Sequence, residues 1–436
     1  MDDVIRKTIT IGLPTLLFFI IAGNTGKTGQ AAIWRALENL GQPFGLLMSL
    51  AILVFIGLVA SYLSRYLVDG LLVKFYQKRR QLEPPEKLLI EIDKLPLSQD
   101  LKIKLSWSVT YNYTNPINNF NLKYITTKIF IIVIIITALL SISNYFGASY
   151  RLLELTSHFK LQYLTIGFTC AIFFLLTQTP KRWLVVSAFC IIINLAEIVP
   201  WYFPEPSIAA DKPGQNLRIF QSNVWTSNRH YADVISLVRE EKPDIAVFVE
   251  VAKNTWAKEL TALKDILPYS FGNQDSEEFG MVIYSKIPLK NPALKNFSSG
   301  RKSLLTDIKI QGKIITILVA HPPFPLKNRT FVDRNNQLAG IGKYVAEAQN
   351  PVIVIGDLNV TMWSPFYKSM VETGGLRNAR SGFGILPTWP TYRPLISIPI
   401  DHCLVSGDIQ VLNIRLGRQV GSDHLPLITD LVINNN

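Results

Sequence analysis

The sequence has little charge and almost no cysteine. Of its 436 residues, 17% are Asp, Glu, Lys or Arg and only 3 are Cys, whereas 48% are hydrophobic. The mean hydropathy of +0.23 excludes a single soluble domain. Cys403 stands alone in the C-terminal half, so no disulfide framework is available there and cysteine usage does not indicate the compartment.

Charged residues are absent from a few long runs rather than being uniformly sparse along the chain. Three apolar runs contain no charged residue, and a fourth contains only Glu197; they are 44–64, 129–150, 161–180 and 183–203. Each is close to the roughly 20 residues that a helix needs to cross the hydrocarbon core. A shorter run, 8–23, is either a retained span or a signal-peptide core without a clear cleavage site. We expect an all-α transmembrane region over 1–203 with four or five helices.

Lysine and arginine are placed asymmetrically around these runs. They are frequent in 65–128 and recur in the connector that holds Lys181 and Arg182, so both segments are expected to be cytoplasmic. One further span then places the rest of the chain on the extracytoplasmic face of the cell membrane. The opposite orientation would give a cytoplasmic domain suited to DNA repair or nucleotide signalling. The basic loop 65–128 has no assigned role, although binding anionic headgroups is one option.

The C-terminal half has the pattern of an independent domain. Residues 204–216 are rich in Pro, Ala and Gly and read as a linker. Beyond them, apolar strands such as "DIAVFVEV" and "VIVIGDLN" alternate with amphipathic helices. This pattern predicts an α/β (α+β) domain over 217–432, a four-layer sandwich of two packed β-sheets with outer helices. With 25 basic and 20 acidic residues in 211–436, it is mildly basic, compatible with an anionic substrate.

Polar side chains stand at the ends of these apolar strands. They are Asn223, Glu250, His321, Asp357, Asn359, Asp401, Asp423 and His424. Each has an ordinary explanation, such as an edge carboxylate that reaches solvent, a turn residue, a helix cap or a strand-end ion pair. A carboxylate within a run as apolar as that around Glu250 is nevertheless costly unless it is paired or bound to a metal.

Taken together, these side chains match one kind of chemistry. Oxygen ligands without cysteine suit Mg²⁺ or Mn²⁺, which use one or two carboxylates plus substrate phosphate and water. Two histidines and additional carboxylates can transfer protons. Metal-assisted hydrolysis of a phosphoester needs both.

The order of the motifs resembles a known family. "QSNVW", "DIAVFVEV", "GMVIYSKIPL", "LVAHPPFP", "VIVIGDLNV", "IPIDHCLVS" and "GSDHLPL" resemble the endonuclease/exonuclease/phosphatase (deoxyribonuclease I-like) superfamily over about 217–432. The stretch "TWPTYRPLISIPIDH" looks typical of a bacterial branch with an N-terminal multi-span membrane region. We identify no family resemblance for residues 1–127.

The resemblance implies roles for the strand-end residues. Glu250 would be the main Mg²⁺ ligand beside Asn223, and Asp423 would complete the metal-side carboxylates. Asp357 and Asn359 would contact the scissile phosphate, with Asp357 also positioning the attacking water. His424 would be the general base or the electrostatic partner of the phosphate, oriented by Asp401. His321 matches a second catalytic histidine of the deoxyribonuclease and sphingomyelinase branches. His402 departs from the aromatic or basic residue common there, which leaves the role of Asp401 less secure.

The sequence leaves the substrate open. A membrane-anchored phosphodiesterase could act on nucleic acid, a phospholipid such as sphingomyelin, or an inositol phosphate. Loop residues that bind substrate or merely pack at the surface are Arg301, Arg334, Trp389, Tyr392 and Arg393. The lipid bilayer is the only other partner expected, since no obligate protein partner is implied. The alternative function is an outward-facing membrane protein that binds a ligand or partner without turnover. The number of metals and the oligomeric state stay open.

Overall fold

The computed structural model describes residues 69–70, 72–111, 122–143, 145, 147–148, 150–203, 214–273, 279–297, 301–407 and 409–434. The expected spans 8–23 and 44–64 lie outside the described residues, as does most of the linker. The chain divides into two compact units, Met1–Thr126 and Thr127–Asn436.

The described part of the first unit is helical. Residues 72–80, α4 (Pro85–Lys94) and α5 (Gln99–Thr110) enclose a small apolar core formed by Val73, Tyr76, Leu88, Ile92, Leu101, Leu105 and Val109. Arg79 forms a two-pronged ion pair with Glu91, with Nη1–Oε1 at 2.6 Å and Nη2–Oε2 at 2.9 Å. Most of the described residues of the basic segment 65–128 are therefore folded into helices around their own core.

Apolar helices follow, and the first of them begins just before the boundary between the units. They are α6 (Leu122–Ser143), α7 (Arg151–Leu155), η2 (Thr156–Phe159), α8 (Lys160–Leu176), α9 (Lys181–Ile198) and η3 (Val199–Tyr202). In the described part of the chain, three helical stretches are long and apolar enough to cross a membrane: Tyr124–Ser143, Arg151–Leu176 and Lys181–Tyr202. The first two begin several residues before the corresponding charge-free runs, 129–150 and 161–180. The reason is that the helices start with segments that contain charged residues, which the runs by definition exclude.

Two mixed sheets follow. The first has the order β11-β12-β1-β2-β4-β3 and the second β5-β6-β7-β8-β10-β9. Their strands are β1 (Gly214–Asn223), β2 (Ile245–Val251), β3 (Tyr269–Asn273), β4 (Gly280–Ser285), β5 (Lys290–Lys295), β6 (Ser303–Ile310), β7 (Lys313–Val319), β8 (Val352–Asp357), β9 (Arg377–Asn378), β10 (Asp401–Val405), β11 (Gln410–Leu416) and β12 (Leu427–Asn434). Each sheet has one parallel pair, β1–β2 in the first and β7–β8 in the second, and the other pairs are antiparallel.

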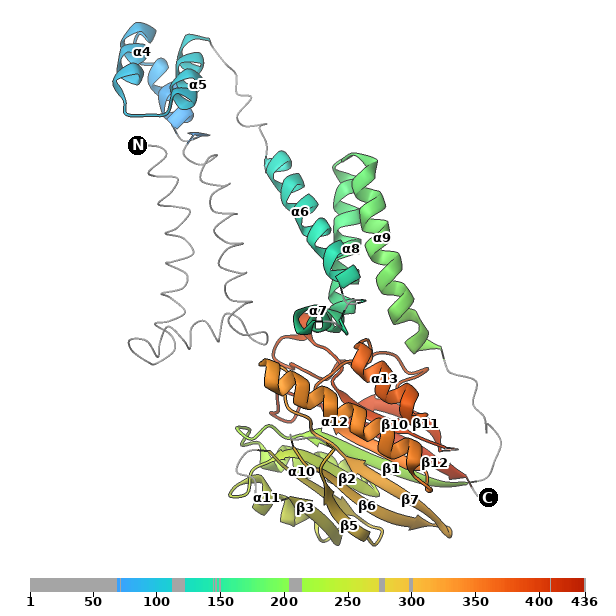
Figure 1. Cartoon of the computed structure of the whole chain (residues 1–436). Helices are drawn as coiled ribbons and strands as arrows, with labels where there is room; N and C mark the ends of the chain where they lie inside the picture. The colour runs from blue at the N-terminus through green and yellow to red at the C-terminus, as the bar shows by residue number, and fades with distance from the viewer. Residues whose placement is uncertain are drawn as a thin grey trace. The chain divides into compact units, whose positions relative to one another are not determined.

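The sheets pack face to face with helices outside (Figure 1). The core between them contains residues of both, such as Ile219 and Val247 from the first and Ile317 and Ile355 from the second. The helices α10 (Tyr231–Glu241) and α11 (Trp256–Glu259) cover the first sheet, while α12 (Asn328–Glu347) and α13 (Pro365–Gly374) cover the second. The predicted four-layer sandwich is confirmed.

A few elements differ from the sequence prediction. The amphipathic stretch 255–266 forms only α11 and the short 3-10 turn η4 (Leu260–Leu263) rather than one continuous helix. The strands β3 and β5 and the helix α13 were not predicted. All six positions of β5 are exposed, so this strand has no apolar alternation to reveal it.

Candidate active site

Strand register gathers the polar residues at one edge of the sandwich. Asp357 ends β8 and lies opposite Asp401, the first residue of the antiparallel β10. In the first sheet, Asn223 ends β1 beside Val249 of the parallel β2, which places Glu250 next to it. His424 lies three residues before the antiparallel β12, whose start lies at the same end of β1. Residues separated by up to 201 positions therefore converge on one edge.

The backbone is unusual at these strand ends. Glu250 has a φ of 61° and sits at a bulge between Val249 and Val251, where β2 loses its regular pairing with β4. Asn359 has a φ of 51°. Positive φ is costly for side chains other than glycine and is concentrated at functional sites, and bulges redirect side chains. Both residues therefore point their polar groups where a regular strand or turn would not.

Glycine is required just before Asp357. Gly356 has a φ of 140°, and a Cβ there would lie 2.1 Å from the carbonyl oxygen of Ala320. Only a residue without a side chain permits this approach of β8 to the segment that leads to His321.

A pair of carboxylates, the partly buried Glu250 and the buried Asp357, forms the centre of the site. The amide nitrogen of Asn223 donates to Glu250 Oε1 at 3.0 Å and to Asp357 Oδ2 at 3.1 Å. His321 Nε2 lies 3.8 Å from the same Glu250 oxygen and 3.6 Å from the same Asp357 oxygen. Burial raises the pKa of Glu250, and burial together with the charge of Asp401 raises that of Asp357 to about 7. Both carboxylates are therefore harder to ionise than carboxylates in water.

The donor set fits a hard divalent cation. One ligand atom from each of Glu250, His321 and Asp357 lies within 4.8 Å of the others, and the same holds for Asp357, Asp401 and His424. The two carboxylates match the oxygen preference of Mg²⁺. A cation at this point would offset the repulsion between them.

His424 and Asp401 form a buried ion pair beside this centre. His424 Nδ1 lies 2.8 Å from Asp401 Oδ2, and the other Asp401 oxygen accepts a hydrogen bond of 2.8 Å from Gln221 Nε2. His424 Nε2 is directed toward Asp357, 3.8 Å from its Oδ2. Burial alone would lower the pKa of His424, but the carboxylates of Asp401 and Asp357 outweigh it and raise the pKa to about 10. The paired imidazole is therefore held with one nitrogen facing the carboxylate centre.

His402 does not compete for Asp401. Successive residues of a strand point to opposite faces, and His402 Nε2 lies 2.8 Å from the carbonyl oxygen of Val360. Burial lowers the pKa of His402 to about 3, so it is a neutral core residue. The departure from the family pattern at this position leaves the Asp401–His424 pair intact.

Arg301 and Asn359 complete the polar lining. Arg301 Nη1 lies 3.2 Å from His321 Nδ1, and its guanidinium stacks over the Phe279 ring at 3.7 Å. Asn359 donates its backbone N–H to Asp357 Oδ1 at 2.9 Å and its amide to the carbonyl of Pro322 at 3.0 Å. Arg301 places a positive charge at the edge of an otherwise acidic centre.

Asp423 is held by Trp389 beside the carboxylate centre. Its Oδ2 accepts a 3.0 Å hydrogen bond from the Trp389 indole, and it belongs to neither potential metal group among the described residues. Trp389 in turn packs between His424 and Phe324, with ring centroids 6.2 and 5.8 Å away. The predicted residues Asp423 and Trp389 therefore form one wall of the site.

Arg334 corrects the sequence prediction. It was a candidate for substrate binding, but its side chain is fully buried and ion-paired with Glu154, Nη2–Oε1 at 2.9 Å. Its Nη1 donates to the backbone carbonyl of Asn359 at 3.0 Å. A guanidinium enclosed in this way cannot reach a substrate, whereas Tyr392 and Arg393 are exposed.

Sequence reasoning missed two supporting residues. Gln221 holds Asp401, and Ser422 donates to the carbonyl of Asn223 at 2.7 Å while accepting from the N–H of His424 at 3.1 Å. Gln221 lies two residues before Asn223, on the same face of β1. A polar residue on the same strand face as Asn223 was the available signal for Gln221; Ser422 had none.

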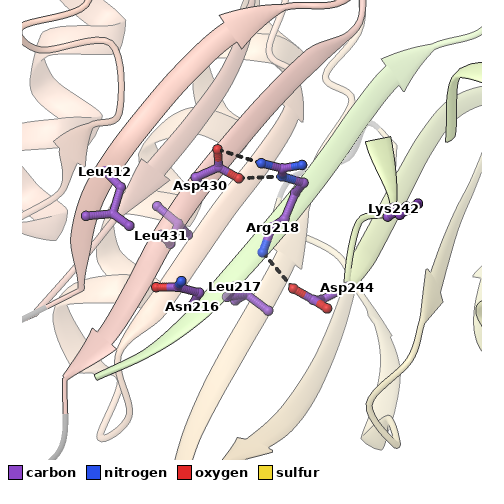
Figure 2. Close-up of a pocket in the computed structure, with 8 residues that line it drawn as sticks. All are labelled: Asn216, Leu217, Arg218, Lys242, Asp244, Leu412, Asp430 and Leu431. Carbon is purple, nitrogen blue, oxygen red and sulfur yellow. Dashed lines mark hydrogen bonds and ion pairs between the residues drawn. The ribbon is translucent and has the colours of Figure 1, made fainter. Parts of the chain in front are cut away.

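A hollow at the other end of the same strands has different chemistry. Figure 2 shows Arg218 paired with both oxygens of Asp430 and its backbone N–H donating to Asp244. The hollow is lined by Asn216, Leu217, Arg218, Lys242, Asp244, Leu412, Asp430 and Leu431. The Arg218 guanidinium and both Asp430 oxygens are used in this ion pair. The residues that line the hollow are therefore better explained as a structural contact than as a reaction site.

Comparisons with known proteins match the second half of the chain. Solved structures similar to it include D. rerio TDP2 humanized by 14 mutations (16% identity, TM-score 0.42, covering 50% of this chain and 98% of that one). Others are a truncated Caenorhabditis elegans TDP2 (17% identity, TM-score 0.43, 51% and 100% covered) and an endonuclease/exonuclease/phosphatase from Beutenbergia cavernae (17%, 0.42, 50% and 72%). Similarity of this degree assigns no substrate. No curated protein matches the chain.

The family model described as Endonuclease/Exonuclease/phosphatase family matches residues 220–424. This range begins on β1 and ends at His424, so it contains the carboxylate centre and both histidines. The bacterial branch and its membrane region stay predictions. The resemblance seen in the motifs is confirmed for residues 220–424, which form a domain of the endonuclease/exonuclease/phosphatase family.

Proposed function

We propose that this protein is a membrane-anchored, Mg²⁺- or Mn²⁺-dependent phosphodiesterase that hydrolyses a phosphoester by attack of water. One observation carries the proposal. Glu250, Asp357 and Asn223 share hydrogen bonds, with His321 and His424 each within 4 Å of Asp357 Oδ2. The family domain at 220–424 supports the same reaction class.

Glu250, with Asn223 and Asp357 beside it, would hold the cation. When bound, Mg²⁺ supplies positive charge to a phosphoryl oxygen and makes bound water more acidic. Asp423 is assigned to support this side of the site through Trp389. The amide of Asn223 and the bulge at Glu250 would keep the two carboxylates fixed and partly dehydrated.

His424 would handle the proton or the charge of the phosphate. Asp401 fixes the ring through Nδ1, so Nε2 is the only nitrogen available to the reacting groups. In the neutral form Nε2 can accept the proton of the attacking water, and in the charged form it can stabilise the phosphate. His321, Arg301 and Asn359 would bind phosphoryl oxygens from the opposite side.

The distribution of charge and the position of the helix ends support the proposed membrane topology. Both Arg151 and Trp201 contact the domain, through Leu326 and through the N–H groups of Gly382 and Gly384. Figure 1 shows the turn between α8 and α9 at the other end of these helices. That turn carries Lys181 and Arg182, so the positive-inside rule assigns it to the cytoplasm and the domain to the extracytoplasmic face.

The test uses the full-length protein in detergent with a soluble chromogenic diester, bis(p-nitrophenyl) phosphate. Hydrolysis should require Mg²⁺ or Mn²⁺ and should fall by at least 10²-fold in Glu250→Ala and His424→Ala. His230→Ala is the matched control, because this histidine is 65% exposed and pairs only with Asp233 in the described contacts. Unchanged hydrolysis in Glu250→Ala or His424→Ala would refute the assignment.

A further inference from the structure

One short segment contacts three loops of the candidate active site. Residues 151–162 form α7, η2 and the start of α8, and they begin the apolar stretch Arg151–Leu176. Figure 1 shows α7 against the side of the sandwich that carries α12 and α13. This segment is therefore the point where an apolar helix meets the catalytic domain.

The first contact is with the loop that follows His321. Arg151 donates to the carbonyl of Leu326 at 2.5 Å and to Asn328 Oδ1 at 2.9 Å. Phe324, in the same loop, packs against Trp389. Both partners of Arg151 lie within seven residues of His321, so this loop links the site histidine to the start of the helical stretch Arg151–Leu176.

The other two contacts are with the loops that follow Asp357 and Trp389. Glu154 Oε1 accepts from Ser364 at 2.6 Å, and His158 Nδ1 lies 2.9 Å from Thr361 Oγ1. Gln162 donates to the carbonyls of Leu395 and Ser397, both at 3.2 Å. Residues 151–162 therefore hold all three loops that border the carboxylate centre. The same residues are where the helical stretch Arg151–Leu176 passes from contacts with the domain to an apolar surface.

The exposed side chains of this rim have the composition of a membrane interface. Leu395 is 88% exposed and Leu326 is 46% exposed. The exposed apolar and basic residues on or next to these contacts are Tyr150, Leu152, Leu326, Lys327, Arg329, Tyr392, Arg393 and Leu395. Tyrosine is enriched at bilayer interfaces, leucine inserts below the headgroups, and lysine or arginine attracts anionic lipid.

We infer that the rim of the candidate site rests on the bilayer surface and that its substrate is the headgroup phosphodiester of a membrane phospholipid. The inference rests on the proposed function, and it adds the substrate class. An apolar helix fixes the rim at the interface, and the rim's leucines and basic residues fit acyl chains and phosphates. A nucleic acid would instead favour an open basic groove, without exposed leucines at its edge.

The reaction consumes one water molecule. Its oxygen forms a new bond to phosphorus, one P–O bond to an alcohol of the diester breaks, and the departing oxygen receives a proton. The products are a phosphomonoester and an alcohol, one of which stays in the bilayer. No oxidant or second substrate is needed.

The test places the full-length protein in vesicles of phosphatidylcholine and phosphatidylglycerol with Mg²⁺, and measures released phosphomonoester or alcohol. The wild type should cleave vesicle lipid and also bis(p-nitrophenyl) phosphate. Leu395→Asp and Leu326→Asp should each lower the ratio of lipid to soluble-diester hydrolysis at least tenfold. Leu412→Asp is the matched control, because this leucine is 47% exposed at the other end of the strands and should leave the ratio unchanged.

The possible failures are distinguishable. Cleavage of the soluble diester without cleavage of vesicle lipid, or an unchanged ratio in both rim variants, overturns the inference and leaves the phosphodiesterase standing. Faster cleavage of single-stranded DNA or RNA than of vesicle lipid has the same meaning. Absence of cleavage of both the lipid and the soluble diester removes the proposed function, and the inference with it.

Discussion

Replacing Glu154 with alanine should destabilise the catalytic domain from a position outside it. Glu154 lies on α7, and its carboxylate is paired with Arg334 of α12 while accepting from Ser364 at the start of α13. Both charged side chains are 0% exposed. The substitution would leave the Arg334 guanidinium buried without its anion.

The magnitude follows from burial. Removing one partner of a buried ion pair costs about 3–5 kcal/mol, because the remaining charge is uncompensated. For a domain of this size, each kcal/mol lowers Tm by roughly 2–4 °C. Glu154→Ala should therefore lower Tm by about 6–20 °C. The loop that carries Asn359 should loosen as well, since Arg334 donates to the Asn359 carbonyl.

The measurement is thermal unfolding of the full-length protein in detergent, followed by tryptophan fluorescence. Lys368→Ala is the matched control: its ion pair with Glu197, at 3.1 Å, also joins the helices to the domain, but the lysine side chain is 52% exposed. An exposed pair contributes only about 0–1 kcal/mol. The double variant Glu154→Leu/Arg334→Met removes both charges and should be more stable than Glu154→Ala. A Tm for Glu154→Ala equal to that of Lys368→Ala would refute the reasoning, as would strictly additive losses in the double variant.

Three further predictions concern the site itself. Asp401→Asn should lower kcat on the soluble diester by about 10²–10⁴-fold, because the His424 ring loses the carboxylate that orients it; a loss confined to KM would contradict this. Removal of divalent ions with EDTA should abolish hydrolysis, and added Mg²⁺ should restore it in the wild type but not in Glu250→Ala; activity that survives EDTA counts against the metal. Gly356→Ala should lower Tm clearly more than Gly312→Ala, since both have positive φ but only Gly356 would place a Cβ 2.1 Å from a carbonyl oxygen, whereas Gly312 has nothing within 4 Å; equal losses would show that strain alone, about 1–3 kcal/mol, explains the effect.

The candidate site was predictable where a polar residue interrupts or ends an apolar strand. Glu250 stood out because its strand is otherwise continuous and apolar, and His321, Asp357 and His424 each end or precede such a run. The periodicity also predicted most strands and the layered architecture. It failed for β5, whose positions are all exposed, and for Arg334, whose burial depends on a partner 180 residues earlier.

The sequence by itself determined the secondary-structure elements and the polar side chains of this protein. They are three apolar helices in the described residues, two sheets, and a set of carboxylates, amides and imidazoles at strand ends. These are local properties, because hydropathy and alternation are read from neighbouring residues. Only the tertiary structure decided which of them meet. Register between strands distant in sequence brought Asp401 to Asp357 and His424, and packing turned Arg334 inward to Glu154. Such contacts depend on long-range packing energy, which no short stretch of sequence contains.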